Sequence, residues 1–171
     1  MFETDNLKVF SWQSALIAIS QREEPCRGLL YQYRVVDFET GESRRSHLYQ
    51  SEREAIVAAK IQALDLAIGK VVHPAGLVDL SNDRVIRTNL ASQDLFGRSL
   101  EGKLMSSICS DLENVANFYR NLKMNGSCLG VTKLATVLGD RDILTSAVSY
   151  PDLGLFRCDV LFLSKGYCES H

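Results

Sequence analysis

The chain has 171 residues, of which 46% are hydrophobic and 23% are charged, as in an ordinary soluble globular protein. Its formal net charge is -2, so the chain as a whole lacks the strongly basic character of nucleic-acid-binding domains. No apolar run approaches the roughly 20 residues of a membrane span, and the N-terminus lacks the pattern of a secretory signal. The five cysteines are odd in number and widely spaced, which favours reduced thiols and a cytoplasmic protein.

Residues 1–70 are expected to form an N-terminal α/β element in the order helix, β-hairpin, long helix. Residues 11–20 carry apolar side chains at the spacing of one face of a short helix. Residues 29–38 alternate between apolar and polar side chains, as a half-buried strand does, and residues 44–50 return as a more polar edge strand. Gly41 lies in the turn between them.

A long helix is expected from Ser51 to Ile68. Ser51 and Glu54 have the spacing of a capping box at its start, and Gly69 is a typical stop at its end. Several alanines share one face of this helix, so it is expected to pack closely against a neighbour. That neighbour is either the hairpin or the same helix of a second subunit.

Residues 74–165 form a second predicted unit, and residues 166–171 are a tail. This unit contains two strands, several short helical segments and three antiparallel strands. In chain order the expected elements are strands over 76–80 and 84–89, helical segments over 91–97 and 99–108, an amphipathic helix over 111–126, and strands over 128–138, 142–150 and 155–163.

Local motifs accompany this order of elements. Asp79 ends the first strand, Ser81-Asn82-Asp83 forms a turn, Ile86 and Asn89 lie on the second strand, and LFGRSLEGK follows at 95–103. Together they resemble the PAS domain family, in which an Asn caps the short helix and a Phe-Gly pair ends it. The resemblance implies an α+β fold, with a curved five-stranded antiparallel sheet and helices on one face.

The interior of a PAS-like unit is either solid or occupied by a ligand. The resemblance offers no known cofactor: the long helix has no cysteine for a flavin adduct, and no histidine for haem lies between His73 and His171. Cys109 lies near the place of a chromophore-bearing thiol, but Thr88 and Ser92 stand where its acidic and phenolic partners are expected. An unknown small ligand remains an alternative. Its candidate pocket residues are Val78, Val85, Phe118, Tyr119, Leu129, Val131 and Leu144.

Catalytic and nucleic-acid functions find less support. No hydrolase, metalloprotease or phosphate-loop motif occurs, so neither an enzyme nor a catalytic residue is expected. Cys168 and His171 supply two ligands, too few for a tetrahedral zinc site, and no metal is expected. Nucleic-acid binding through the hairpin is a second alternative, although Glu39 and Glu42 occupy its turn. Its candidate contacts are Arg34, Arg44, Arg45 and His47.

The sequence therefore predicts a small cytoplasmic regulatory or adaptor protein of bacterial type. Its PAS-like domain is expected to mediate protein–protein interaction and homodimerisation in signal transduction, without a membrane partner. No output domain is recognised after residue 165, so the output is expected to come from a bound partner. The candidate interface residues are Phe156, Val160 and Phe162 on the last strand.

Overall fold

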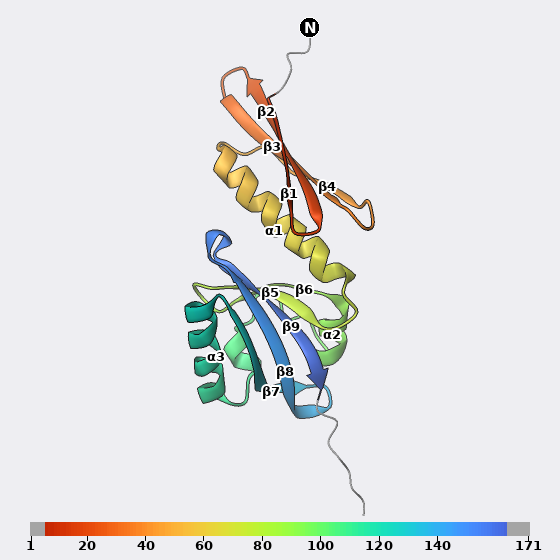
Figure 1. Cartoon of the computed structure of the whole chain (residues 1–171), viewed down its shortest axis with the longest axis vertical. Coiled ribbons are helices and arrows are strands. Elements are labelled where there is room, and N and C mark those ends of the chain that lie inside the picture. The colour runs from red at the N-terminus through yellow and green to blue at the C-terminus, as the bar shows by residue number, and fades with distance from the viewer. Residues whose placement is uncertain (1–5, 164–171) are drawn as a thin grey trace, which may run out of the picture. The chain divides into compact units, whose positions relative to one another are not determined.

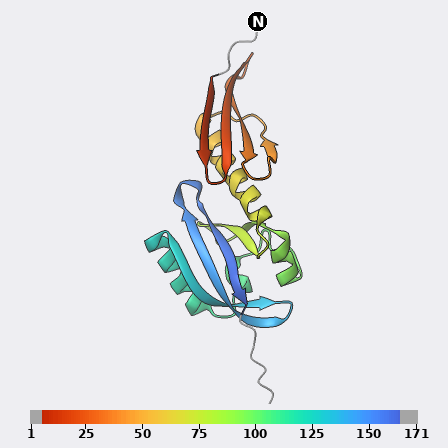
Figure 2. The ribbon, with the colours of Figure 1, turned by 45° about the vertical axis from the view of Figure 1, so that its right-hand side comes forward.

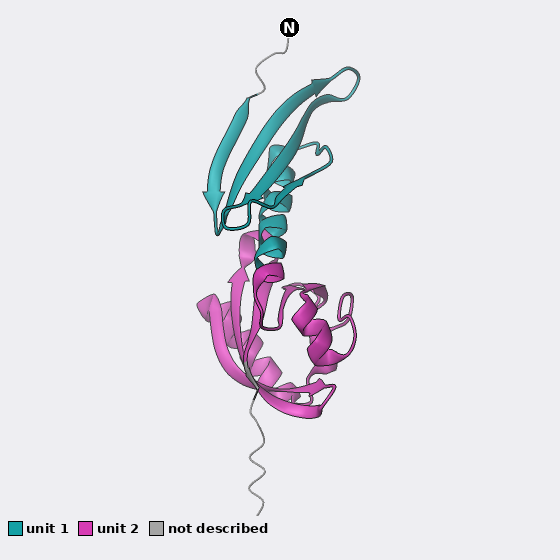
Figure 3. Cartoon of the chain, turned by 90° about the vertical axis from the view of Figure 1, so that its right-hand side faces the viewer, with its two compact units in different colours: residues 1–67 teal, residues 68–171 magenta. Residues whose placement is uncertain are grey.

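The computed structural model describes residues 6–163, so the predicted tail with Cys168 and His171 lies outside the described residues. The fold is mixed α and β, with one four-stranded and one five-stranded antiparallel sheet (Figure 1). The chain divides into two compact units, residues 1–67 and residues 68–171 (Figure 3). Within the described part, no helix combines the length and the apolar character needed to cross a bilayer.

The N-terminal unit contains a sheet and a helix that packs on one of its faces (Figure 2). The elements are β1 (Leu7–Trp12), β2 (Ala15–Glu24), β3 (Gly28–Asp37), β4 (Ser43–Arg45) and α1 (Glu52–Lys70). Neighbouring strands are antiparallel in the order β1-β2-β3-β4. Alternate residues of β2 and β3, among them Ile17, Ile19 and Val35, are buried against the alanine face of α1.

The predicted helix over residues 11–20 is wrong, because this segment forms the end of β1, a two-residue turn and the first part of β2. Trp12 pairs with Ala15 in an antiparallel hairpin, and Gln13 in the turn has a φ of 53°. Ile17 and Ile19 are fully buried while Leu16 and Ala18 on the opposite face are half-buried. Since both faces of the strand are apolar, the hydrophobic spacing alone did not distinguish period 2 from period 3.6. The element is therefore a four-stranded sheet with one helix, and not helix–hairpin–helix.

The long helix begins as predicted and ends later. The Ser51 hydroxyl accepts a hydrogen bond from the backbone N–H of Glu54 at 3.2 Å. The helix then continues through Gly69 to Lys70. Ala55, Ala59 and the other buried residues of its alanine face contact the sheet of the same chain, which decides between the two neighbours expected for this face.

The second unit has its sheet in the order β6-β5-β9-β8-β7. Its elements are β5 (Ala75–Asp79), β6 (Val85–Thr88), α2 (Leu90–Phe96), the 3-10 turn η1 (Met105–Ile108), α3 (Leu112–Asn125), β7 (Ser127–Thr136), β8 (Gly139–Tyr150), the 3-10 turn η2 (Pro151–Leu153) and β9 (Leu155–Leu163). The helical stretch expected over 99–108 shrinks to η1. The reason is that Gly102 and Lys103 form backbone hydrogen bonds with Val85 of β6, which extends the chain there.

Two residues predicted to shape the start and end of α2 do so. The Asn89 side-chain oxygen accepts a hydrogen bond from the Ser92 N–H at 3.0 Å, which caps the helix. Gly97 ends it with a φ of 66°, and an added Cβ there would lie 2.5 Å from Val137 Cγ1. Only glycine combines that backbone angle with that close approach.

Candidate functional site

The interior of the second unit is nearly filled. Among the described residues, the core between the sheet and the helices holds cavities of about 30 and 20 Å³, which share Met105, Thr145 and Cys158 in their walls. The first cavity has room for a water molecule, which needs roughly 10–15 Å³. The Thr88 hydroxyl in its wall is buried and has no hydrogen-bond partner among the described residues. Neither cavity has the volume of a typical small-molecule site, roughly 300–1,000 Å³.

The candidate pocket residues divide into two groups. Val78 and Val85 line the first cavity, and Phe118 and Tyr119 line the second. The remaining three were assigned to the wrong face. Leu129 and Val131 are 64% and 55% exposed on β7, and Leu144 is half-buried opposite Val131 in the ladder between β7 and β8.

The side of β7 that faces the core carries smaller residues than the outer side. Gly130 lies on the inner side, where an added Cβ would be 3.7 Å from the Phe118 ring of α3. Thr132, also on that side, is hydrogen-bonded to Thr145 of β8 at 3.3 Å. Between Leu129 and Thr132 the more apolar side chains of β7 therefore point outwards, the reverse of the usual arrangement for a strand that covers a core. Further along the strand, Leu134 is fully buried on the inner side.

Tyr119 links three elements around the second cavity. Its hydroxyl donates a hydrogen bond to Asp83 in the turn between β5 and β6, and the same carboxylate accepts the Ser106 N–H of η1 at 2.8 Å. The ring packs edge-on against Phe156 at 5.6 Å between centroids. Burial, followed by the neighbouring Asp83, raises the pKa of the Tyr119 phenol above its ordinary value. The phenol is therefore a neutral donor that fixes the wall of the cavity.

The thiols near this cavity are protonated and inert. Burial raises the pKa of Cys109 and of Cys158 to about 12 each. The Cys109 thiol lies 3.3 Å from the backbone carbonyl of Met105. Since the thiolate is the nucleophile, these groups act as small apolar fillers and not as attachment points for a chromophore.

The outer face of the five-stranded sheet carries an apolar cluster, which we call the outer patch: Leu129, Val131, Leu144 and Val148. Val131 lies directly opposite Leu144 in the ladder. Leu129 lies opposite Ser146, and Val148 follows Ser146 by two residues on the same face of β8. The four side chains therefore lie on neighbouring positions of the outer face of β7 and β8. A cluster of exposed apolar side chains is typical of a protein contact site.

Charged pairs border the outer patch. On β9, Arg157 forms two hydrogen bonds of 2.8 and 2.7 Å to the Asp159 carboxylate. The ring of His73 lies 2.8 Å from the same carboxylate. The sequence did not predict this cluster, because a partner 86 residues away gives no local signal.

The candidate interface residues on β9 are mostly in the core. Phe156 is 1% exposed and Val160 is 9% exposed, so their assignment to an exposed face was wrong. A bulge between Leu144 and Thr145 shifts the register of β8 against β9 and brings Phe162 opposite Leu144 in the ladder. The side chain of Phe162 lies outside the described residues.

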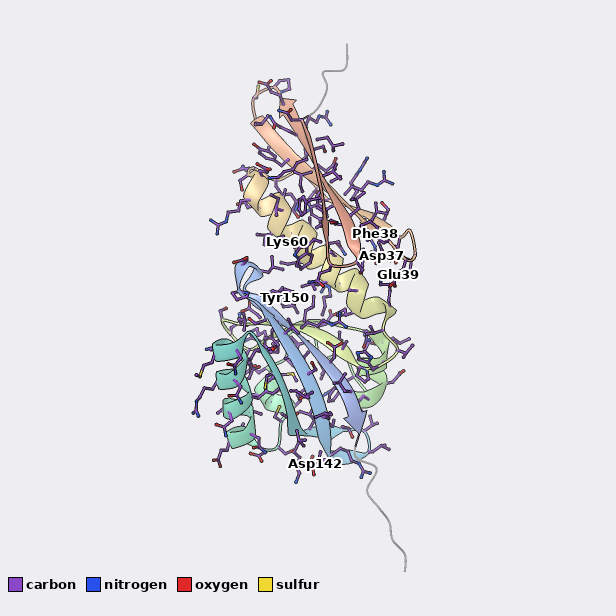
Figure 4. The ribbon with its side chains drawn as sticks, viewed as in Figure 1. Asp37, Phe38, Glu39, Lys60, Asp142 and Tyr150 are labelled. Carbon is purple, nitrogen blue, oxygen red and sulfur yellow. The ribbon has the colours of Figure 1, made fainter. Side chains whose placement is uncertain are left out.

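The candidate nucleic-acid residues do not form one surface. Arg34 and Arg45 are exposed cross-strand neighbours on β3 and β4, whereas Arg44 pairs with Glu42 at 2.6 Å. His47 lies against the Tyr49 ring, with 4.7 Å between centroids. The turn next to these residues is fixed by Asp37, whose carboxylate accepts three hydrogen bonds from the following residues; Asp37, Phe38 and Glu39 are labelled in Figure 4.

No family model matches the chain, and no curated protein matches it either. Within the part of the chain that the structure describes, no group of three or more His, Cys, Asp or Glu side chains is placed to hold a metal ion.

Proposed function

We propose that this protein is a regulatory adaptor without catalytic activity, and that its second unit is a PAS-like domain that binds other proteins. The resemblance to the family is supported by the five-stranded antiparallel sheet. It is also supported by the Asn89 cap and by the left-handed Gly97 at the end of α2. In this proposal the protein acts in signal transduction in the cytoplasm as a homodimer.

The observation that carries this proposal is the contrast between the two faces of the sheet. The inner face is packed with cavities of only 30 and 20 Å³, whereas the outer face exposes the outer patch of aliphatic side chains. A ligand sensor needs a pocket of useful volume, and an adaptor needs an exposed contact surface. The adaptor reading therefore fits better than the sensor or the nucleic-acid alternative.

Charge on β7 and β8 would help a partner to dock in one orientation. Lys133 and Asp142 lie opposite each other at one end of the outer patch, and the Arg157–Asp159 ion pair lies beside Val148 and Ser146. An apolar centre with a polar border is the usual composition of a specific protein interface. We expect the partner to cover Leu129 and Val131, the most exposed side chains of the patch.

The test is affinity capture from the lysate of the source cells, with wild-type protein and the Val131→Lys variant as baits. We expect the wild type to retain a specific protein that Val131→Lys loses by at least tenfold. The matched control is Met124→Lys, which introduces the same charge at an exposed apolar side chain of α3 and should keep the partner. An identical set of captured proteins for wild type and Val131→Lys would contradict the proposal.

A further inference from the structure

Three of the four outer sheet edges in the described chain are protected over at least part of their length. The β6 edge is covered by residues 102–104, with backbone hydrogen bonds of 2.8 and 2.9 Å between Val85 and the segment Gly102–Lys103. The β7 edge is covered near Leu134, where Cys109 forms a bridge and Ser110 donates to the Lys133 carbonyl at 2.8 Å. Such coverage prevents a strand edge from pairing with another chain.

The β4 edge is protected in another way. The strand has only three residues, Ser43, Arg44 and Arg45, and all three are exposed. A short edge with charged side chains is a poor template for strand addition. The β6 edge is therefore covered, the β7 edge is covered at Lys133 and Leu134, and the β4 edge is protected by its short length and its charge.

The β1 edge has no covering segment among the described residues, and it carries a single charge. It presents the five residues Leu7 to Ser11, and among the described residues only β2 pairs with them (Figure 2). Leu7 is 62% exposed and Val9 is 49% exposed. The one charge in the strand, Lys8, is held by Glu52 of α1 at 2.8 Å. An exposed apolar edge strand of this kind is a template on which a further strand can pair.

We propose that β1 pairs antiparallel with β1 of a second copy, so that two N-terminal sheets join into one continuous eight-stranded sheet. This inference rests on the homodimer in the proposed function and assigns that contact to the N-terminal unit. It leaves the outer patch of the second unit free for a different protein.

The sequence of β1 is complementary to itself about a two-fold axis at Val9. That register places Val9 opposite Val9 of the second copy and Leu7 opposite Ser11, all on the outer face. On the inner face it places Lys8 opposite Phe10, so that no like charges face each other. A register centred on Lys8 would oppose two ammonium groups directly. A second copy meets these conditions by symmetry, which is why we choose it as the occupant.

The test is the mass of the full-length protein in solution, by sedimentation velocity, for wild type, Val9→Lys and Val131→Lys. We expect wild type and Val131→Lys to be dimers and Val9→Lys to be a monomer with a wild-type circular dichroism spectrum. A dimeric Val9→Lys protein would overturn the inference. Loss of the dimer in Val131→Lys alone would also overturn it, yet would leave the proposed contact function of the outer patch intact. A monomeric wild type would overturn both the inference and the proposed homodimer.

A cross-link tests the same contact if Val9→Lys fails to fold. The variant Val9→Cys is prepared with the exposed Cys26 replaced by Ser and is then oxidised. We expect a covalent dimer, because the axis brings the two introduced thiols together. The control is Ser43→Cys on the β4 edge in the same background, which should stay monomeric on a denaturing gel. Equal cross-linking of the two variants would contradict the pairing.

Discussion

Asn89 is the buried polar side chain that organises the start of the second unit. Its amide nitrogen lies 3.1, 3.2 and 2.8 Å from the backbone carbonyls of Ile68, Val71 and His73. Its oxygen accepts the N–H groups of Ala75 and Ser92 at 3.1 and 3.0 Å. One amide thus satisfies the backbone before β5 and the start of α2, which is a larger role than the helix cap expected from the sequence.

Replacing this amide should cost more than the loss of an ordinary cap. We expect Asn89→Ala to lower the free energy of unfolding by about 3 kcal/mol, because buried backbone groups lose their partners. Urea unfolding followed by circular dichroism measures this change. The matched control is Asn114→Ala in the first turn of α3, where the side chain is exposed and the expected cost is below about 1 kcal/mol. Equal costs for the two variants would show that Asn89 has no such role.

Tyr119 gives the stability of the second unit a dependence on alkaline pH. Because its pKa is raised in the folded state, its contribution is complete below the ordinary phenol pKa of about 10. It is lost as the pH rises above that value, since the unfolded chain then releases the proton first. We expect Tyr119→Phe to be less stable than wild type at pH 8 and to lose less stability between pH 8 and pH 11. Parallel losses measured by urea unfolding would contradict this assignment.

At the scale of elements, the sequence predicted most strands and helices of the second unit but not all of their faces. The helix α3 and the last three strands lie within a few residues of their predicted bounds. The face of β7 could not be predicted, because Leu129 and Val131 are more apolar than the inner Gly130 and Thr132. Tertiary packing decides which face of β7 is covered by α3, and the local spacing of apolar residues does not reveal it.

The N-terminal unit was harder to predict for a related reason. Its hairpin turn has Gln13 at positive φ, and so lacks the Asn-Gly or Gly signal that usually marks a two-residue turn. Without that signal, a segment that is apolar on both faces resembles a helix. The candidate site had the same weakness: three of the four residues of the outer patch were in the list of pocket residues, but they were assigned to the interior.

Replacement of a valine by aspartate should affect the stability of the second unit differently on β7 and on β9, because Val131 is exposed and Val160 is buried. Val160→Asp places a carboxylate in the core and should destabilise the second unit by more than about 3 kcal/mol. Val131→Asp places the same group in solvent and should change the free energy of unfolding by less than about 1 kcal/mol. Thermal or urea unfolding of both variants measures the difference. A larger loss for Val131→Asp than for Val160→Asp would reverse the assignment of the two faces.

At the scale of the whole molecule, the two units have separate tasks in this account. The N-terminal unit joins two copies through β1, and the second unit presents the outer patch to a partner. The packed core of the second unit stabilises that unit. Met105, Thr145 and Cys158 lie in the walls of both cavities. A packed interior and two distinct contact surfaces describe an adaptor better than a sensor.

Native mass spectrometry of freshly purified wild-type protein tests this account most directly, because it reports the number of copies and any bound molecule in a single spectrum. We predict a dimer of two 171-residue chains with no additional mass. A monomer at micromolar concentration would contradict the pairing of β1 with a second copy. A dimer with a small molecule bound to each chain would contradict the packed interior and the adaptor function.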